Sequence, residues 1–151
     1  MQTQASKRQF LRTAGIAAVA AIIAPRLAGA SPAEVAAEIK KLYVDKKMES
    51  GRIKLDVPQI AENGLVVPIN VEVESPMTSA DFVKSVHVYA EKNPLPAVVS
   101  YKFTPEAGKA AASTRMRLAE TQDIVVVAEM SNGQIFSTRA EVKVTIGGCG
   151  G

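Results

Sequence analysis

The sequence has one cysteine, one histidine and no tryptophan among its 151 residues, and each scarcity excludes something. A single cysteine cannot form a disulfide within the chain, so Cys149 is either free or bonded to a group outside the chain. A single histidine excludes a histidine-rich metal site. Acidic residues are absent from the first thirty positions, and that absence separates this segment from the rest of the chain.

The first thirty residues have the composition of an export signal. They contain four basic residues, of which Lys7, Arg8 and Arg12 precede an apolar run from Ala14 to Ala24 and one, Arg26, follows it. This run is too short for the roughly twenty residues of a membrane-spanning helix. It precedes Ala28-Gly29-Ala30, a small-x-small pattern that signal peptidases cleave. The pattern predicts that residues 1–30 are an export signal cleaved after Ala30, with a retained amphipathic helix as the alternative.

The basic segment also indicates a route and a compartment. Ser6-Lys7-Arg8-Gln9-Phe10-Leu11 resembles the twin-arginine signal S-R-R-x-F-L of proteins exported in the folded state, with Lys7 in place of the first arginine. Cleavage removes four positive charges and lowers the formal net charge from +3 to −1. Nothing basic then remains to attract nucleic acid or an anionic membrane, so we expect neither as a partner. The expected location is the bacterial periplasm.

Residues 31–146 are predicted to form one domain that begins with a helix. Ser31-Pro32-Ala33-Glu34 combines a capping serine, a proline suited to the first turn and an acidic residue at the positive end of the helix dipole. Val35, Ile39 and Leu42 recur at helical spacing and form one apolar stripe. The sequence therefore predicts an amphipathic helix within Pro32–Lys47.

After Gly51 the apolar residues recur at a period of two, which is typical of antiparallel strands with one buried face. The alternating segments are 53–57, 71–73, 85–88, 114–118 and 141–146. Two further runs, 65–69 and 124–128, are continuously apolar and are expected to be central strands, although Pro68 favours an edge or a bulge. The run 124–128 belongs either to the core or to a partner interface.

Turn residues separate these strands, and Asn132-Gly133 predicts a two-residue hairpin. Seven or eight short strands, spaced roughly ten residues apart, indicate a mainly β fold. The predicted fold is an immunoglobulin-like antiparallel β-sandwich with an N-terminal helix.

His87 and two lysine pairs are further candidates for a site. His87 lies in mid-strand on the face of Ser85 and Tyr89, and no second ligand or nucleophile has matching spacing. We therefore expect a histidine at the solvent or at an interface. Lys40-Lys41 and Lys46-Lys47 are expected to be a solvated helix face, with an electrostatic docking patch as the alternative.

The chain ends in TIGGCGG, which places the cysteine third from the end between two pairs of glycines. Glycine loses more conformational entropy on ordering than any other residue. Residues 147–151 are therefore predicted to form a flexible arm, whose glycines are Gly147, Gly148, Gly150 and Gly151. The arm continues the predicted strand 141–146, and three residues at 3.3 to 3.6 Å each let Cys149 reach roughly 10 Å beyond Ile146.

The residues next to Cys149 supply no group that would activate its thiol. An unperturbed cysteine has a pKa of about 8.5, so only a few per cent is thiolate at pH 7. We therefore assign no catalytic residue, no metal and no cofactor, and expect a carrier whose cysteine holds an adduct made and removed by separate enzymes. Two alternatives stay open: a structural or binding sandwich linked through an intermolecular disulfide, and a carrier that uses the terminal Gly-Gly carboxylate as a thiocarboxylate.

Several segments together resemble SoxY, the family of sulfur-carrier subunits of the bacterial thiosulfate-oxidising system. The similar segments are 61–64 through 67–68, 75–77, 91–94, 115–119 with 121–122, 128–133 and 144–151. The similarity extends over the whole mature chain and the export signal.

The resemblance implies an immunoglobulin-like sandwich that pairs in the periplasm with a second sandwich subunit, SoxZ. It implies that Cys149 is the atom of covalent attachment and that the neighbouring glycines are its arm. The transient partners it implies are a c-type cytochrome complex that joins thiosulfate to the cysteine, a hydrolase that releases sulfate, and a dehydrogenase or other acceptor for the remaining sulfur.

Overall fold

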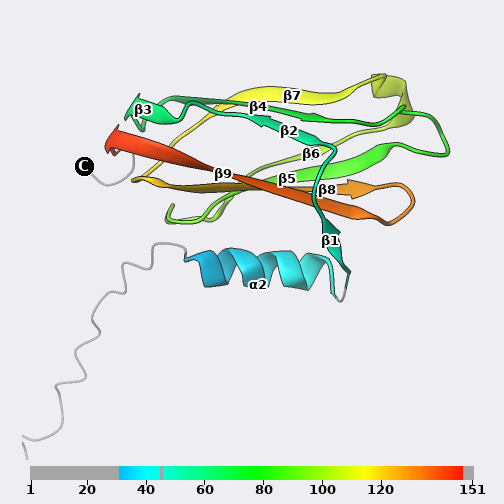
Figure 1. Cartoon of the computed structure of the whole chain (residues 1–151), viewed down its shortest axis with the longest axis horizontal. Coiled ribbons are helices and arrows are strands. Elements are labelled where there is room, and N and C mark those ends of the chain that lie inside the picture. Colours follow the sequence, from blue (N-terminus) through cyan, green and yellow to red (C-terminus); the bar gives the residue numbers. More distant parts are fainter. Residues whose placement is uncertain (1–30, 45, 148–151) are drawn as a thin grey trace, which may run out of the picture.

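The structure is a computed structural model that describes residues 31–44 and 46–147, and this part of the chain is mainly β with one α-helix (Figure 1). The helix is α2 (Pro32–Leu42), and a short 3₁₀ helix, η1 (Pro105–Ala107), lies between two strands. The nine strands of the described part are β1 (Met48–Glu49), β2 (Ile53–Asp56), β3 (Ile60–Asn63), β4 (Val67–Val73), β5 (Val83–Ala90), β6 (Ala97–Lys102), β7 (Ala110–Met116), β8 (Gln122–Met130) and β9 (Ile135–Ile146). The predicted export signal, residues 1–30, lies outside the described residues.

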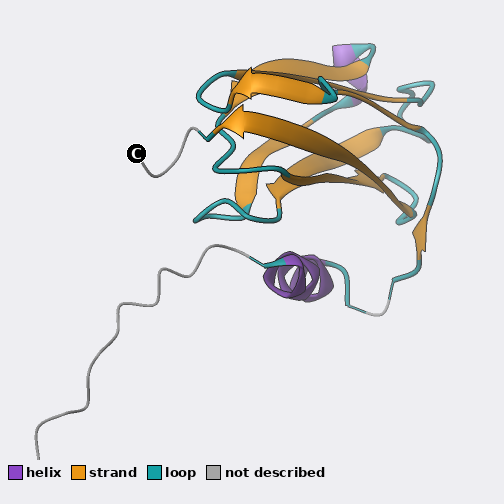
Figure 2. Ribbon diagram, turned by 60° about the vertical axis from the view of Figure 1, so that its left-hand side comes forward, coloured by secondary structure: helices purple, strands orange, loops and turns teal. Residues whose placement is uncertain are grey.

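Two sheets pack face to face, with α2 on the outer face of the larger one (Figure 2). The larger sheet has the order β1-β9-β8-β5-β6, and β3 also pairs with β9. The smaller sheet has the order β2-β4-β7. This arrangement confirms the predicted mainly β sandwich with a preceding helix, whereas its immunoglobulin-like classification stays a prediction.

The pairing of β1 and β3 with β9 is parallel, which differs from the antiparallel sheet expected from the sequence. The chain leaves the edge of β9 after β1, crosses to the smaller sheet as β2, and returns to β9 as β3. Gly51 and Arg52, with φ of 101° and 58°, make the first crossing. Both strands therefore run in the same direction as β9, and both pairings are parallel.

Strand β8 is buried on both faces, which explains its continuous apolar run. Ile124 and Val126 face the interior of the sandwich, where the larger of the two hydrophobic clusters lies. Val125 and Val127 face the opposite way, into a second cluster with residues of α2. Of the two readings of segment 124–128, the structure favours the core, because the chain itself covers both faces.

Helix α2 begins as predicted and ends earlier. Ser31 and Glu34 form a reciprocal capping box, in which each side chain accepts a hydrogen bond from the other residue's backbone N–H. The helix ends at Leu42, short of Lys47, and Leu42 is 56% exposed. The prediction that Leu42 belongs to the apolar stripe was wrong, because Tyr43, four residues after Ile39, occupies that place. No helix of the described part is long and apolar enough to cross a membrane.

Pro68 in β4 has a neighbouring strand on one side only. Strand β4 is the middle strand of its sheet, but β2 pairs only with the residues from Asn70 to Val73. Pro68 is therefore paired only with Arg115 of β7. A proline fits there because it has no backbone N–H to donate, and on the open side of β4 there is no neighbouring strand to accept one.

The β8–β9 connection is a hairpin with a longer loop than the predicted two residues. Met130 donates its N–H to the carbonyl of Gln134 (2.9 Å), and Gly133 donates to the carbonyl of Met130 (3.0 Å). Gly133 has φ of 85°, as in three-residue hairpins that close with a left-handed glycine.

The helix stripe can be tested with two substitutions on α2. Ile39→Ala removes side-chain volume from the cluster between α2 and the sheet, and we expect it to lower the free energy of unfolding by about 2 kcal/mol or more. Leu42→Ala, the matched control, is expected to change it by less than about 0.5 kcal/mol because Leu42 is exposed. Urea denaturation measures both, and equal losses would contradict the packing described.

Candidate functional site

The structure describes the point at which the C-terminal segment leaves the sheet. Cys149, Gly148, Gly150 and Gly151 lie outside the described residues, so their predicted roles stay predictions. Gly147 is described and follows the last residue of β9. We use the term arm root for residues 144–147 together with the two segments that contact them, 61–64 and 117–121. Figure 1 shows the end of β9 beside β3.

On one side, the end of β9 is held by β3. Ala61 is paired with Val144, and Asn63 with Ile146. Gly64 donates its N–H to the carbonyl of Ile146 (2.7 Å). The strand is therefore hydrogen-bonded up to its last residue, and the tail begins from a fixed point of the sheet.

On the other side, the loop 117–121 replaces β8, whose pairing with β9 ends at Val142. The hydroxyl of Thr121 accepts the N–H of Val144 (2.9 Å). Leu118 donates its N–H to the carbonyl of Gly64 (2.8 Å), which joins this loop to the β3 side. The three segments of the arm root are thus joined to one another by hydrogen bonds.

Gly147 lies directly against the backbone of this loop. A Cβ built on Gly147 would collide with the carbonyl oxygen of Ala119 and would lie 3.2 Å from its carbonyl carbon. The absence of a side chain at residue 147 therefore permits a close approach to the loop. Sequence reasoning assigned Gly147 to the arm on flexibility alone, and the structure adds this packing reason.

Three of the segments that carry the resemblance meet near the arm root, although they are far apart in sequence. Segment 61–64 pairs with β9, and segment 115–122 supplies Ala119 and Thr121. Segment 91–94 contacts the loop 117–121 through the side chain of Asn93. The sequence alone did not indicate that these segments share one location, because no local pattern encodes contacts between loops.

The other two segments lie together elsewhere. Ser131, at the turn between β8 and β9, donates its N–H to the carbonyl of Phe82 (2.8 Å). Ser75 donates its hydroxyl to the carbonyl of Asp81 (3.2 Å). Segments 75–77 and 128–133 are therefore both joined to residues 81–82, which suits a structural role in connecting the two sheets.

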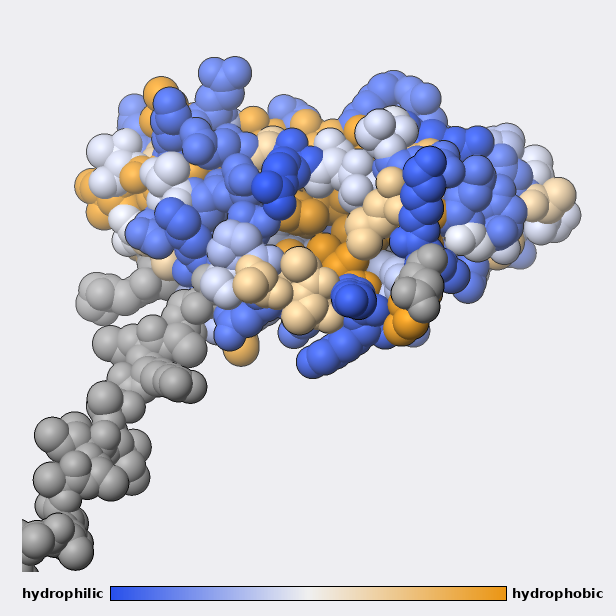
Figure 3. All heavy atoms as spheres, turned by 60° about the horizontal axis from the view of Figure 1, so that its bottom comes forward, coloured by the Kyte–Doolittle hydropathy of each residue, from blue (hydrophilic) through white to orange (hydrophobic). Residues whose placement is uncertain are grey.

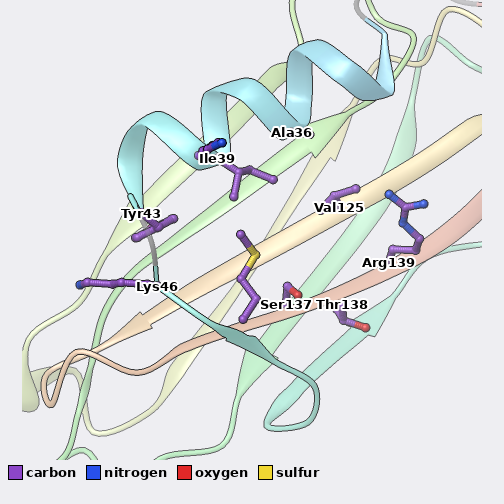
Figure 4. A pocket seen from close by; sticks show the side chains of 10 residues that line it. Ala36, Ile39, Tyr43, Lys46, Val125, Ser137, Thr138 and Arg139 are labelled. Carbon is purple, nitrogen blue, oxygen red and sulfur yellow. The ribbon is translucent and has the colours of Figure 1, made fainter.

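A groove lies between α2 and the larger sheet, apart from the arm root (Figures 3 and 4). Its volume is about 630 Å³, and hydrophobic residues flanked by hydrophilic ones are visible along this face. Side chains from α2, the segment after it, β1, β8 and β9 line it: Ala36, Ile39, Lys40, Tyr43, Lys46, Met48, Val125, Ser137, Thr138 and Arg139. Among residues 31–44 and 46–147, no group of three metal-binding side chains comes together.

The charged residues of this region are largely paired with each other. Arg139 bridges Glu91 (2.7 Å) and Asp123 (3.4 Å), and the side chain of Glu91 is only 7% exposed. Lys46 lies 3.7 Å from Glu129. The prediction that Lys46 and Lys47 lie on a helix face was wrong, because α2 ends at Leu42. Lys46 lies beyond the helix and contributes to a surface ion pair, which is a weak interaction.

His87 lies at an interface within the chain, between β5 and the end of α2. Its Nδ1 is 2.7 Å from the hydroxyl oxygen of Ser100 on the neighbouring strand. The rings of Tyr43 and Tyr89 lie near that of His87, with centroids 6.3 and 6.4 Å away. A histidine at the solvent or at an interface was expected, and the structure places His87 where the end of α2 packs on the sheet.

These features define a class of protein: a β-sandwich whose last strand continues into a cysteine-bearing C-terminal segment. A family model described as "Sulfur oxidation protein SoxY" matches residues 39–149. The structure of the sulfur carrier protein SoxY from Chlorobium limicola f thiosulfatophilum is similar, with a TM-score of 0.65 and 30% sequence identity. The match covers 77% of this chain and 100% of that one.

The chain belongs to the SoxY family. The family and the structural match support a sulfur-carrier role in sulfur oxidation, with partners in the Sox system. No curated protein sequence matches the chain.

More distant structures share the fold alone. A superoxide reductase from Ignicoccus hospitalis has a TM-score of 0.56 at 16% identity, and the match covers 76% of this chain and 94% of that one. A putative superoxide reductase from Thermotoga maritima has a TM-score of 0.54 at 16% identity, with coverage of 66% and 93%. The same sandwich therefore occurs in proteins named for a different activity.

The close contact of Gly147 predicts a local effect of substitution. In Gly147→Ala, the new methyl group would collide with the backbone of Ala119, and the end of β9 would move away from the loop. We expect faster hydrogen exchange of the Gly64 amide, because its acceptor is the carbonyl of Ile146. Exchange measured by NMR should be unchanged in Thr145→Ala, an exposed control on the same strand. Equal protection of Gly64 in both variants would contradict the contact.

His87 predicts a pH dependence of stability. Burial lowers the pKa of His87 below its ordinary value of 6.5, Glu129 opposes this shift and Lys102 adds to it. The unfolded chain therefore binds the proton more readily, so the stabilising contribution is present above pH 6.5 and is lost as the pH falls below it. We expect the free energy of unfolding to fall from pH 7 to pH 5 more steeply in the wild type than in His87→Gln. Urea titrations at each pH measure the two slopes, and equal slopes would contradict the shift.

Proposed function

We propose that this chain is a periplasmic, non-enzymatic carrier that holds thiosulfate-derived sulfur on Cys149 while separate enzymes act on it. The observation that carries the proposal is the extent of the family match, which ends at residue 149, the single cysteine. The match therefore includes the predicted attachment atom as well as the sandwich.

The chemistry of the carrier requires an oxidant and then water. Joining the thiol of Cys149 to the outer sulfur of thiosulfate forms a sulfur–sulfur bond and releases the thiol proton and two electrons. A c-type cytochrome complex would accept the two electrons. A hydrolase would then add water across the bond to the sulfone, release sulfate and leave a persulfide on the cysteine. A dehydrogenase or another sulfur acceptor would remove the remaining sulfur.

The described part of the chain supports the division between a rigid body and a reactive tail. The end of β9 is hydrogen-bonded on both sides, and the cysteine follows three residues after Ile146. A catalyst must therefore approach the arm root to within roughly 10 Å to reach the thiol. Since the tail supplies no base, activation comes from the visiting enzyme.

The location and the permanent partner are part of the proposal. A sulfur–sulfur adduct is cleaved by thiols, so it is stable outside the thiol-rich cytosol, in agreement with the predicted export signal in residues 1–30. A SoxZ-like sandwich subunit is the proposed permanent partner.

The last residues of the chain would enter the narrow active-site channels of the visiting enzymes, because glycines flank the cysteine on both sides.

Intact-protein mass spectrometry tests this function. We expect the wild-type chain, in complex with its partner subunit, to gain the mass of a thiosulfate-derived group after incubation with thiosulfate and the cytochrome complex. Cys149→Ser is expected to stay unmodified, because serine cannot form the sulfur–sulfur bond. An unmodified wild type, or an adduct that persists in Cys149→Ser, would reject the proposal.

One further variant separates the two kinds of sulfur carrier. An alanine added after Gly151 removes the terminal Gly-Gly carboxylate and leaves the cysteine in place. Adduct formation should persist in this variant if the thiol is the attachment atom, and it should disappear if a thiocarboxylate is used.

A further inference from the structure

Two buried amide side chains near the arm root have no role in the proposed chemistry. Asn93, in the loop between β5 and β6, is 8% exposed, and Gln122, the first residue of β8, is 3% exposed. Polar side chains buried to this degree are costly unless each is hydrogen-bonded. Their partners therefore indicate what the two amides hold in place.

Asn93 binds the loop 117–121 at two points. Its Nδ2 donates to the carbonyl of Arg117 (2.8 Å), and its Oδ1 accepts the N–H of Ala119 (3.0 Å). The same Oδ1 accepts a hydrogen bond from Nε2 of Gln122 (3.0 Å). The amide of Asn93 thus takes the place of a neighbouring strand for this segment of backbone.

Gln122 completes the set of contacts. Its Nε2 also donates to the carbonyl of Glu120 (3.1 Å), and its Oε1 accepts the N–H of Lys92 (2.8 Å). Gln122 therefore connects the loop that contains Asn93 to the loop 117–121. We refer to Asn93 and Gln122 as the amide pair.

The loop held by the amide pair is the one that supports the end of β9. Ala119, which binds Asn93 through its N–H, meets Gly147 through its carbonyl oxygen. Thr121, which accepts the N–H of Val144, precedes Gln122 directly. One segment, residues 119–121, thus contacts both the buried amides and the last described residues of the chain.

We propose that Asn93 and Gln122 are positioning residues for the C-terminal arm: they fix the loop 117–121, and this loop fixes the place and direction in which residue 147 leaves the sandwich. The inference deepens the proposed function and rests on it for its biological purpose. Because only three residues separate Ile146 from Cys149, a displaced root cannot be compensated by a long linker. A small displacement of a reacting group is enough to slow a reaction strongly.

Spin labels measure the position of the arm without any sulfur chemistry. One nitroxide is attached to Cys149 and a second to Ser113→Cys, an exposed site on β7 of the smaller sheet. Pulsed electron resonance then gives the distribution of distances between the labels. We expect this distribution to shift or broaden in Asn93→Ala and in Gln122→Ala, and to be unchanged in Asn132→Ala, an exposed asparagine in the β8–β9 turn.

A milder pair of variants keeps the test decisive if an amide variant fails to fold. Thr121→Val removes the hydroxyl that accepts the N–H of Val144, whereas Thr121→Ser retains it. We expect hydrogen exchange of the Val144 amide to rise about tenfold in Thr121→Val and to stay close to the wild-type rate in Thr121→Ser. The spin-label distribution should follow the same order.

The outcomes separate the inference from the proposed function. Wild-type distance distributions in both Asn93→Ala and Thr121→Val would overturn the positioning role, even if Cys149 carries sulfur. A broadened distribution together with no adduct on the wild-type cysteine would support positioning and reject the carrier function. If both hold, the apparent KM of the conjugating complex for the variant carrier should rise more than kcat falls, whereas alkylation of Cys149 by a small reagent should keep its rate.

Discussion

The burial of β8 on both faces is the constraint on which the rest of the molecule depends. Its residues face the sandwich interior on one side and α2 on the other, so the strand has no freedom to shift without exposing apolar surface. Strand β9 is fixed because it pairs with β8 over most of its length. The position at which the C-terminal segment begins is therefore set by the hydrophobic packing of β8, the strand beside β9.

Beyond Val142, hydrophobic packing gives way to hydrogen bonding. The last residues of β9 have lost β8 as a neighbour and are held by β3 on one side and by the loop 117–121 on the other. The hydroxyl of Thr121 takes the place of β8 at Val144, and the side-chain amides of Asn93 and Gln122 hold the loop that carries this hydroxyl. The end of β9 is therefore held on both sides up to the residue where the C-terminal segment begins.

Much of the fold could be predicted because it follows from local patterns. The capping residues of α2, the alternation in β2 and β9 and the apolar run of β8 are each encoded within a few neighbouring residues. The errors arose where distant residues decide: Tyr43 displaced Leu42 from the stripe because the sheet determines which side of the helix is covered. The parallel pairing of β1 and β3 was missed because periodicity does not report which strand is the neighbour.

The sequence by itself determined the single cysteine, its glycine neighbours and its place three residues after the last strand, because these are properties of the covalent chain. The sequence also carried the resemblance that the family match confirmed. Only the tertiary structure decided that segments 61–64, 91–94 and 115–122 meet at the arm root, and that Gly147 is pressed against Ala119. Contacts between loops depend on how two sheets and a helix pack, and no periodicity along the chain records that packing.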